Sequence, residues 1–511
     1  MEQNKLFETD LRHRLEGLTR EQLIEFNQGQ ADIIVQYQKH ILAIEAFNCE
    51  LQQKTFFIED QHIILKNKMF GKSSEKSANK ENFSELKKPK APGSRKILLP
   101  SERYPDAPLI ERDVELEHLP SCKCCNAQMT DSGMTEDSEF LTVIPAQFFV
   151  VRQKRHKYRC GKCHGDIVTA PSPLKIKPGS SYSDEMVVDV ALTKYCDLIP
   201  MERYSSIAGR AGLSKLPPQS LIECSHYLAD FIKEVYHKLK TEICASIVLH
   251  ADETPHRMLE GSAKLSWYLW GFSSETTAYF ECHDTRSGDI ASELLKNSKC
   301  EYLMSDVFSG YHKATSVTND YRELNKLNFL INIYCNAHAR RKFKDAAISF
   351  SEVAKFYINQ YRKIYRLENL AKKYPDLKQK IRFRLRKYFE KMKTKALSEM
   401  TGYSSKSSIY MAMNYFLKNY VGFTRFIDNI SLPIDNNPQE RLLRNPVIGR
   451  KTWYGTHSER GAETSAILFS LVESCKLNKI NPRIYFKNLV QDLHLGKNPY
   501  TPKEFKDLQS I

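Results

Sequence analysis

Two closely spaced pairs of cysteines restrict the fold of this chain more than any other feature of the sequence. Cys122 and Cys125 form the first pair, in LPSCKCCNAQM, and Cys160 and Cys163 form the second, in RHKYRCGKCHGDIV. Two C-x-x-C turns separated by a hairpin supply the four thiolates of a tetrahedral zinc ribbon. The spacing therefore predicts a Zn²⁺ site, and the competing interpretation is a set of unrelated buried cysteines.

The remaining cysteines favour metal binding over a disulfide framework. The chain has 13 cysteines, an odd number, and only the two pairs and Cys124 are clustered. Such a pattern is typical of a protein in a reducing compartment. Cys124 competes with Cys122 as a ligand, and His164 competes for a fourth position, so the individual ligands stay open.

Length and composition indicate a folded, multidomain protein. A chain of 511 residues is expected to form three or four domains. Its 41% hydrophobic, 11% aromatic and 27% charged residues exclude collagen-like, mucin-like and wholly disordered chains. No run approaches 18 apolar residues, and the opening MEQNKLFETDLRHR lacks the apolar segment of a secretory signal. We therefore expect a cytoplasmic protein without a membrane span.

An excess of basic residues predicts a polyanionic partner, and nucleic acid is the first candidate. The chain has 76 Lys and Arg against 61 Asp and Glu, and residues 351–430 alone have 18 against 6. Within them, residues 381–400 alternate basic with apolar residues, which predicts a helix with one buried and one cationic face. A merely solvated helix face is the alternative. The predicted phosphate contacts are Arg382, Arg384, Arg386 and Lys387.

The N-terminal region has the pattern of a coiled coil. Between residues 19 and 71 apolar residues recur at alternating steps of three and four, at Ile34, Tyr37, Ile41, Ile44, Leu51, Ile58, Leu65 and Met69. Polar residues interrupt this seam at Asn48, Thr55 and His62, a feature that can set register and partner number. We expect a coiled coil that pairs chains; a long helix packed on its own domain is the alternative. The Ser-rich and Lys-rich segment after it predicts a flexible linker.

The middle of the chain changes from helices to strands. Residues 181–242 look helical, with short turns that suit either a helix-turn-helix unit or a simple connection between the zinc unit and the next domain. Strands are then expected at 246–252, 265–273 and 277–284, followed by strands at 300–306 and 329–335 that alternate with helices. This order predicts a mixed α/β sheet.

Two aspartates end strands that could be neighbours in that sheet. Asp252 ends the first strand and Asp306 ends the fourth, so both carboxylates would emerge at one edge if the strands are adjacent and parallel. Such an edge could hold two Mg²⁺ ions, which prefer oxygen ligands and align the oxygens of phosphodiester cleavage or transfer. Glu440 and Asp435 compete to be a third acid from a nearby helix.

Basic and aromatic residues surround this third acid. Arg444, Arg450 and Lys451 supply charge that suits phosphates. Trp453 could stack on an unpaired base, although a core indole is an equal alternative.

Several segments resemble, in order, the signatures of the DDE transposases of the insertion sequence 66 family. They are VLHADETPHRM, LMSDVFSGY, YCNAHARRKF, IDNNPQERLLRNPVIGRKTWYGT and CKLNKINPRIYFKNLV, preceded by FGKSSEK, the cysteine pairs and LTKYCDLIPMERY. The resemblance implies a ribonuclease-H-like core with the acidic triad Asp252, Asp306 and Glu440. It also implies an α-helical insertion between the last two acids, and Mg²⁺ or Mn²⁺ as cofactor. The implied reaction cuts the 3′ strands at transposon ends and joins them to target DNA.

The resemblance also implies how the chain is organised. We expect a multidomain α+β chain with a coiled coil, a linker, a zinc ribbon, a helical DNA-binding-like unit, and a mixed α/β core interrupted by a basic helical insertion. The corresponding ranges are 1–71, 72–99, 100–180, 181–244, 245–350 with 431–511 for the core, and 351–430 for the insertion. The expected partners are DNA, a second copy or higher oligomer, and small accessory proteins encoded nearby.

Some positions depart from the family pattern or leave a role open. Asn126 and His164 stand where the family often has Gly after each C-x-x-C turn. Glu253 is expected to face away from Asp252, because successive strand residues point to opposite faces. His338 and Arg341 are candidate DNA contacts, with helix packing as the alternative. Two further functions stay open: a DNA-binding protein without catalysis, and a nuclease that cuts without joining.

Overall fold

The computed structural model describes residues 17–70, 99–105, 108–111, 118, 120–121, 124–125, 127–128, 138–142, 147–159, 167–259 and 266–509. These residues divide into two compact units. The larger contains the N-terminal helix and almost all residues from 154 onward, and the smaller lies within residues 72–153 and 210–213.

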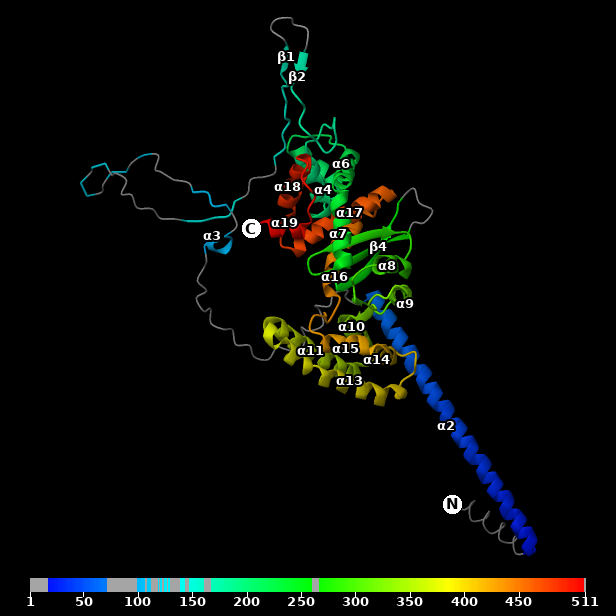
Figure 1. Cartoon of the computed structure of the whole chain (residues 1–511). Coiled ribbons are helices and arrows are strands. Elements are labelled where there is room, and N and C mark those ends of the chain that lie inside the picture. Colours follow the sequence, from blue (N-terminus) through cyan, green and yellow to red (C-terminus); the bar gives the residue numbers. More distant parts are fainter. Residues whose placement is uncertain are drawn as a thin grey trace. The chain divides into compact units, whose positions relative to one another are not determined.

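The N-terminal region forms one long helix, α2, from Arg20–Phe70. This confirms the predicted helix over residues 19–71 (Figure 1). Its seam is exposed to solvent at Ile34, Tyr37, Ile41, Ile44, Leu51 and Ile58. The coiled coil, which would cover these apolar residues, stays a prediction. In the described part of the chain, no helix combines the length and apolar character of a membrane span.

The cysteine-rich region is described in part. Ser121 and Gln128 pair in an antiparallel bridge, and Cys124 and Cys125 occupy the turn between them. Strands β1 (Lys157–Arg159) and β2 (Ile167–Thr169) form an antiparallel hairpin, and Cys160, Cys163 and His164 belong to the segment that joins them. That segment and Cys122 lie outside the described residues. The smaller unit has a single short described helix, α3 (Pro100–Arg103), whose Ser101 donates to the Glu139 carboxylate.

The region from residue 181 to the start of β3 (Val248–Arg257) is helical, as the sequence predicts, and has four helices. They are α4 (Asp184–Tyr195), α5 (Met201–Arg210), α6 (Pro218–Phe231) and α7 (Lys233–Ala245). α4 and α6 pack against the C-terminal helices α17 (Glu459–Leu477) and α18 (Pro482–His494), which α19 (Pro502–Gln509) follows. His226 on α6 is hydrogen-bonded to Thr464 on α17 at 2.6 Å. These helices therefore share a core with the end of the chain.

A five-stranded mixed sheet forms the centre of the larger unit, and its strands lie where the sequence predicts them. They are β3 (Val248–Arg257), β4 (Ser266–Ser273), β5 (Ala278–His283), β6 (Tyr302–Ser305) and β7 (Ile331–Tyr334). The order across the sheet is β5-β4-β3-β6-β7. β3 pairs with β4 antiparallel and with β6 parallel, and β7 continues the parallel half. β3 runs past Asp252 to Arg257, because its far half still pairs with β4.

Helices cover both faces and one edge of the sheet (Figure 1). α16 (Asn437–Trp453) packs on β3 and β4. α8 (Gly288–Leu295) and α9 (Ser309–Leu324) lie together, and Tyr311 of α9 contacts Trp270 on the opposite face. α17 covers the edge strand β5, where the Ser470 and Ser474 hydroxyls accept hydrogen bonds from the backbone N–H groups of β5. An edge strand satisfied in this way offers few groups for unwanted pairing.

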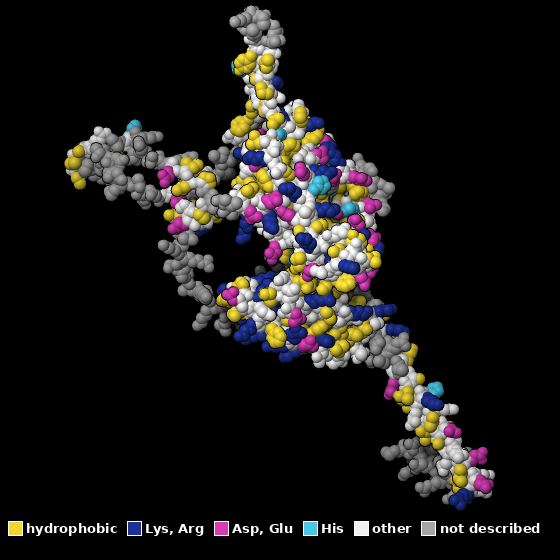
Figure 2. Space-filling model, in the orientation of Figure 1, with side chains coloured by type: hydrophobic (Ala, Val, Ile, Leu, Met, Phe, Trp, Pro, Cys, Tyr) yellow, Lys and Arg dark blue, Asp and Glu magenta, His cyan; other side chains and the backbone are white. Residues whose placement is uncertain are grey.

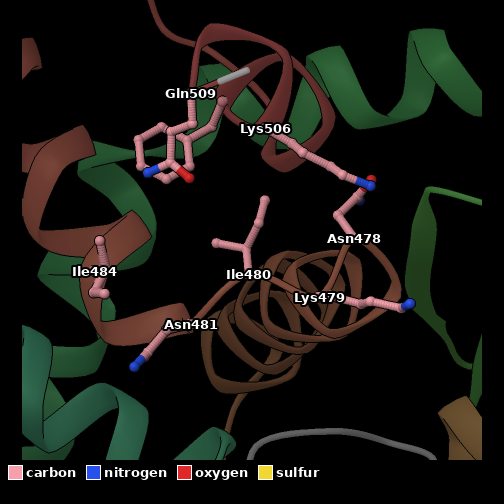
Figure 3. A pocket seen from close by; sticks show the side chains of 8 residues that line it. Asn478, Lys479, Ile480, Asn481, Ile484, Lys506 and Gln509 are labelled. Carbon is pink, nitrogen blue, oxygen red and sulfur yellow. The ribbon is translucent and has the colours of Figure 1, made fainter. Parts of the chain in front are cut away.

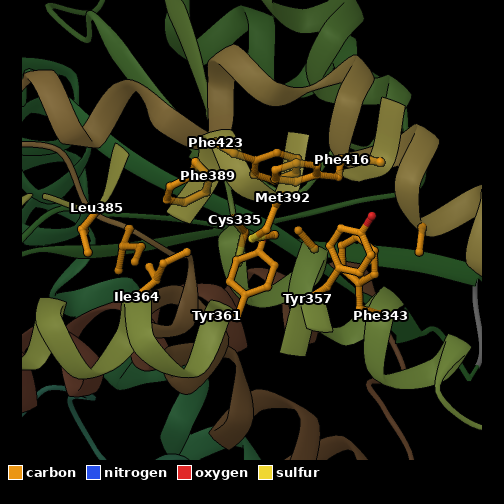
Figure 4. Packing of buried hydrophobic residues seen from close by; sticks show 14 of the residues in the cluster. Cys335, Phe343, Tyr357, Tyr361, Ile364, Leu385, Phe389, Met392, Phe416 and Phe423 are labelled. Carbon is orange, nitrogen blue, oxygen red and sulfur yellow. The ribbon is translucent and has the colours of Figure 1, made fainter. Parts of the chain in front are cut away.

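The chain between Asp306 and Glu440 is largely helical. After α10 (Asn336–Ala346) come α11 (Ser351–Lys373), η1 (Pro375–Leu377), α12 (Lys378–Phe383), α13 (Arg386–Glu399), η2 (Met400–Gly402), α14 (Ser408–Lys418) and α15 (Tyr420–Asp428). Their apolar faces meet in an aromatic cluster (Figure 4). In it the Phe343 and Tyr357 rings are stacked, with 4.2 Å between their centroids. Met304 and Ile333 of the sheet belong to the same cluster, so these helices are built onto the sheet.

Two expectations for residues 381–400 are wrong. The segment is not one helix, because α12 ends at Phe383 and α13 begins at Arg386. Arg382 is not available to phosphates, since it is 2% exposed. Its Nε donates to the Glu368 carboxylate at 3.0 Å, and its Nη1 donates to the carbonyl oxygens of Phe426 and Leu432 at 2.9 Å. A buried guanidinium with these partners holds α15 to α11 and α12.

Candidate catalytic site

Asp252 on β3 and Asp306, directly after β6, occupy equivalent positions relative to the pairing of these two parallel strands. The register of β3 and β6 pairs His250 with Met304, and each aspartate lies two residues beyond its member of that pair. Adjacent strands are roughly 4.8 Å apart. The two carboxylates therefore emerge side by side at the same end of the parallel pair, as the sequence predicts.

The environment of Asp252 is short of compensating positive charge. Burial, together with the negative charges of Glu253, Asp306 and Glu440, raises the pKa of Asp252 to about 8. One hydrogen bond opposes them, from the backbone N–H of Glu253 to Asp252 Oδ1 at 2.9 Å. Asp252, with Asp306 and Glu440 acting on it, therefore belongs to a site that favours a bound cation.

Glu440 reaches this site because both ends of α16 are bonded to β3. At the start of the helix, Asn436 Nδ2 donates to the carbonyl oxygen of Ala251 at 2.9 Å. Just after its end, the Thr456 N–H donates to the carbonyl oxygen of Arg257 at 3.0 Å. The helix that carries Glu440 is therefore fixed along the strand that carries Asp252.

The two candidates for the third acid have different surroundings. Glu440 lies in the first turn of α16 and is 27% exposed at the side chain. Asp435 is 8% exposed and accepts a hydrogen bond from the Asn437 N–H, while Asn436 is the N-cap residue. Burial and the charge of Asp435 raise the pKa of Tyr365, which places Asp435 beside α11. Glu440, and not Asp435, is among the groups whose charge acts on Asp252.

His338 and Arg341 of α10 face Glu440. His338 Nδ1 lies 3.6 Å from Glu440 Oε1, and Arg341 Nη2 lies 3.9 Å from Glu440 Oε2. Among the described residues, neither His338 Nδ1 nor Glu440 Oε1 has a hydrogen-bond partner, although both atoms are buried. Arg341 is half exposed and can reach both Glu440 and solvent.

Glu253 lies on the opposite face from Asp252, as expected, and has partners that the sequence did not reveal. Arg286 Nε donates to its Oε1 at 2.8 Å, and the Tyr311 hydroxyl donates to its Oε2 at 2.6 Å. The Arg286 guanidinium also lies 4.0 Å from the centre of the Phe308 ring. No sequence pattern marks Arg286 or Tyr311, because the contacts depend on how α8 and α9 pack.

Gln439 is a further residue that the sequence analysis missed. It is fully buried, and in the described part of the chain neither polar atom of its carboxamide has a hydrogen-bond partner. Its Nε2 occupies the position that a β-carbon added to Gly271 would take, and Gly271 pairs with Asp252 across β3 and β4. Paired residues on adjacent strands point to the same face. The Gln439 amide therefore lies on the face of the sheet that carries Asp252.

The predicted DNA contacts differ in accessibility. Arg444 and Lys451 on α16 are exposed, and so are Arg384 and Lys387 on the insertion; Arg450 is half-buried. Arg386 is exposed and paired with Asp428. Trp453 instead packs inward, against Tyr195 and over Gly449. Lys and Arg side chains gather over the insertion helices (Figure 2).

A hollow of about 250 Å³ lies elsewhere, where α17 ends and α18 and α19 meet (Figure 3). Its lining includes Lys479, Ile480, Asn481 and Phe505 but no acid, histidine or cysteine. It has none of the groups that phosphodiester chemistry requires. We therefore place the candidate site at the three acids.

The acids fit hard divalent cations by donor type. Asp252, Asp306 and Glu440 offer only carboxylate oxygens, which Mg²⁺ and Mn²⁺ prefer. Burial and the neighbouring acids raise the pKa of Asp252, and a bound cation would oppose them by favouring the ionised carboxylate.

Comparisons with known proteins show the family to which this chain is similar. Residues 179–464 match the family described as "Transposase IS66 family", and residues 120–164 match the "zinc-finger binding domain of transposase IS66". The second match supports Zn²⁺ at the cysteine pairs. Two relatives from Sinorhizobium fredii (strain NBRC 101917 / NGR234) are similar along most of the chain. Uncharacterized protein y4jD is 24% identical, covering 74% of this chain and 75% of its own, and uncharacterized protein y4hP is 23% identical, covering 75% and 72%.

Proposed function

Because the chain belongs to the IS66 transposase family, we propose that it is a DDE-type DNA transposase that binds transposon ends, cleaves the 3′ strands and transfers them to target DNA. The observation that carries the proposal is the matched register of Asp252 and Asp306. Glu440 joins them from a helix fixed to the same strand. We assign these three residues as the catalytic acids.

The catalytic core is, in this proposal, ribonuclease-H-like. Three antiparallel strands followed by two parallel ones, in the order β5-β4-β3-β6-β7, support that assignment. The helices between β7 and α16 are then the insertion that separates the second acid from the third.

Asp252, Asp306 and Glu440 would hold two Mg²⁺ or Mn²⁺ ions. When bound, such ions activate the attacking oxygen and stabilise the leaving oxygen of phosphodiester chemistry. The chain contributes the positions of these carboxylates and a partly buried setting in which their charges act strongly. His338 and Arg341 orient Glu440, and the exposed part of Arg341 is placed to contact a phosphate.

Zinc has a separate role in this proposal. We assign Cys122, Cys125, Cys160 and Cys163 as the ligands of the ribbon, with Cys124 and His164 as the rivals to test. Since four thiolates fill the tetrahedral coordination of zinc and leave no open position, zinc would serve folding and DNA recognition and not the chemical step.

Two surfaces would bind partners: one would bind DNA and the other a second copy of the chain. The exposed Arg384, Lys387, Arg444 and Lys451 would contact phosphates. The exposed stripe of α2 would form a coiled coil, because processing two transposon ends together requires at least two chains. The reaction would take place in the bacterial cytoplasm, where the DNA is, with accessory proteins encoded nearby as further partners.

The decisive experiment is a strand-cleavage and strand-transfer assay with Mg²⁺ or Mn²⁺, on DNA carrying the ends that flank the gene. Wild type should give joined products, and Glu440→Gln should lose both cleavage and joining while still binding the ends. Asp435→Asn is the matched control, because it removes the rival acid at the start of the same helix. Loss of cleavage in Asp435→Asn alone would contradict the assignment of Glu440.

The same assay separates the alternative functions. Cut strands without joined products would indicate a nuclease. End binding without cleavage, also after addition of the neighbouring gene products, would indicate a DNA-binding protein that has lost catalysis.

A further inference from the structure

A thiol, an imidazole and a carboxylate converge beside the catalytic acids. Cys335, His338 and Glu440 each offer one ligand atom, and the three atoms lie within 4.8 Å of one another. Cys335 precedes α10, His338 lies in the first turn of that helix, and Glu440 reaches them from α16. Residues about a hundred positions apart thus form one mixed sulfur, nitrogen and oxygen donor set.

This donor set differs in kind from that of the three acids. Mg²⁺ prefers oxygen ligands, whereas Zn²⁺ binds thiolate, imidazole and carboxylate together. Bond lengths of about 2.0 to 2.3 Å allow one Zn²⁺ to contact all three atoms after small side-chain movements. His338 Nδ1 and Glu440 Oε1, 3.6 Å apart and both buried, have no hydrogen-bond partner among the described residues. Two unsatisfied buried atoms that face each other are the expected property of a site for a cation.

Burial raises the pKa of the Cys335 thiol, and backbone hydrogen bonds act in the opposite direction. Its Sγ accepts a hydrogen bond from the backbone N–H of Asn436 at 3.2 Å, a bond that would stabilise a thiolate. The side chain is fully buried among apolar and aromatic residues, including Tyr361 and Met392 (Figure 4). An apolar shell of this kind limits solvent access to a bound ion.

We propose that Cys335, His338 and Glu440 form a site for Zn²⁺ or a similarly thiophilic divalent cation, distinct from both the ribbon and the oxygen-only acid site. Binding transfers the Cys335 thiol proton to solvent and joins the sulfur to the metal. Because Glu440 belongs to both sets, an ion held here competes with Mg²⁺ for that carboxylate. The consequence, inhibition of strand cleavage by zinc, rests on the proposed function; the cation site does not.

The test measures metal content before activity. Full-length protein with its ribbon loaded with zinc is titrated with Zn²⁺, and bound metal per chain is measured by mass spectrometry. Wild type should take up one zinc more than Cys335→Ser, and Cys300→Ser, which changes another buried thiol, should match wild type. Co²⁺ added to the zinc-loaded protein should give thiolate-to-cobalt absorption in wild type and not in Cys335→Ser. Equal uptake by wild type and Cys335→Ser, with zinc on the ribbon only, would overturn the proposal.

Two further variants guard against misfolding and separate this proposal from the transposase function. Glu440→Gln changes a partly exposed side chain and should also lose the additional zinc, so the result does not depend on the folding of Cys335→Ser. Asp306→Asn should keep the additional zinc while losing cleavage. In a cleavage assay with Mg²⁺, Cys335→Ser should need about tenfold more Zn²⁺ than wild type for half-inhibition. Retention of the additional zinc in Glu440→Gln would contradict the site.

Discussion

The carboxamide of Gln439 occupies the space that a β-carbon on Gly271 would fill. The Gln439 Nε2 atom would clash with that carbon, and the Phe280 ring would lie 2.9 Å from it. Because Gly271 pairs with Asp252, and Gln439 precedes Glu440, this contact sets how closely α16 approaches the strands that carry the acids. The absence of a side chain at Gly271 is thus a condition for bringing the third acid to the first.

Gly271→Ala should lower the free energy of unfolding by about 1 to 3 kcal/mol, because it overpacks a filled site. Gln439→Ala creates room for the added methyl group, so Gly271→Ala should cost less in that background. A double-mutant cycle measured by chemical denaturation tests this coupling. If the effects of the two substitutions on the free energy of unfolding are strictly additive, Gly271 and Gln439 are not energetically coupled.

Asp306→Asn should abolish strand cleavage and leave end binding nearly unchanged. Asparagine keeps the shape and the hydrogen bond from the Phe308 N–H but loses the charge that a cation needs. We expect cleavage to fall by at least about 100-fold, since metal-assisted stabilisation amounts to several kcal/mol. Cleavage rates and gel-shift affinities on the same DNA check this. A parallel loss of binding would argue that Asp306 holds the structure and not the metal.

Arg382→Met should destabilise the protein by about 3 to 5 kcal/mol, because it leaves the buried Glu368 carboxylate without its partner. At a low temperature, at which the Arg382→Met protein is folded, it should bind DNA as wild type does. Arg384→Ala is the matched control on the solvent side. It should scarcely affect stability and should reduce the salt dependence of binding by about one phosphate contact. If Arg382→Met changed the salt dependence of DNA binding and Arg384→Ala did not, Arg382 would be the phosphate contact and Arg384 would not.

His256 should make stability depend on pH below neutrality. Burial and the charge of Arg450 lower its pKa from 6.5 to about 4, and it is hydrogen-bonded to Thr456 at 2.8 Å. The unfolded chain therefore binds the proton more tightly. The contribution of neutral His256 to the free energy of unfolding is complete above pH 6.5. It is lost as the pH falls toward 4, and the loss is about 3 kcal/mol at most. Melting temperatures at about pH 7.5, 6 and 5 should fall less steeply in His256→Gln than in wild type, and parallel curves would contradict this assignment.

Cys160→Ser should remove one zinc per chain and lower thermal stability or end binding, because a ribbon with three thiolates holds zinc weakly. Cys122→Ser and Cys124→Ser, compared side by side, decide between the rival ligands: only the true ligand should release zinc. Cys475→Ser, a buried thiol outside the ribbon, is the control. Unchanged zinc content in Cys160→Ser would remove Cys160 from the ligand set.

The sequence by itself determined the features that depend on local spacing. The five strands, the long N-terminal helix and the helical character of residues 351–430 follow from hydrophobic periodicity, which a single segment contains in full. The positions of Asp252 and Asp306 in the first and fourth predicted β segments indicated that they would meet if those strands were parallel neighbours, and the structure shows that the strands are.

Only the tertiary structure decided which side chains meet across the chain. Periodicity could not reveal that Arg382 turns inward to Glu368 and the carbonyl groups of residues 426–432, since an arginine is normally solvated unless a preformed partner offsets its desolvation. Nor could it reveal that Asn436 bonds to Ala251, 185 residues away, or that Cys335 and His338 converge on Glu440. Such contacts depend on the packing of whole helices on a sheet, because the atoms they join have no relation in local sequence.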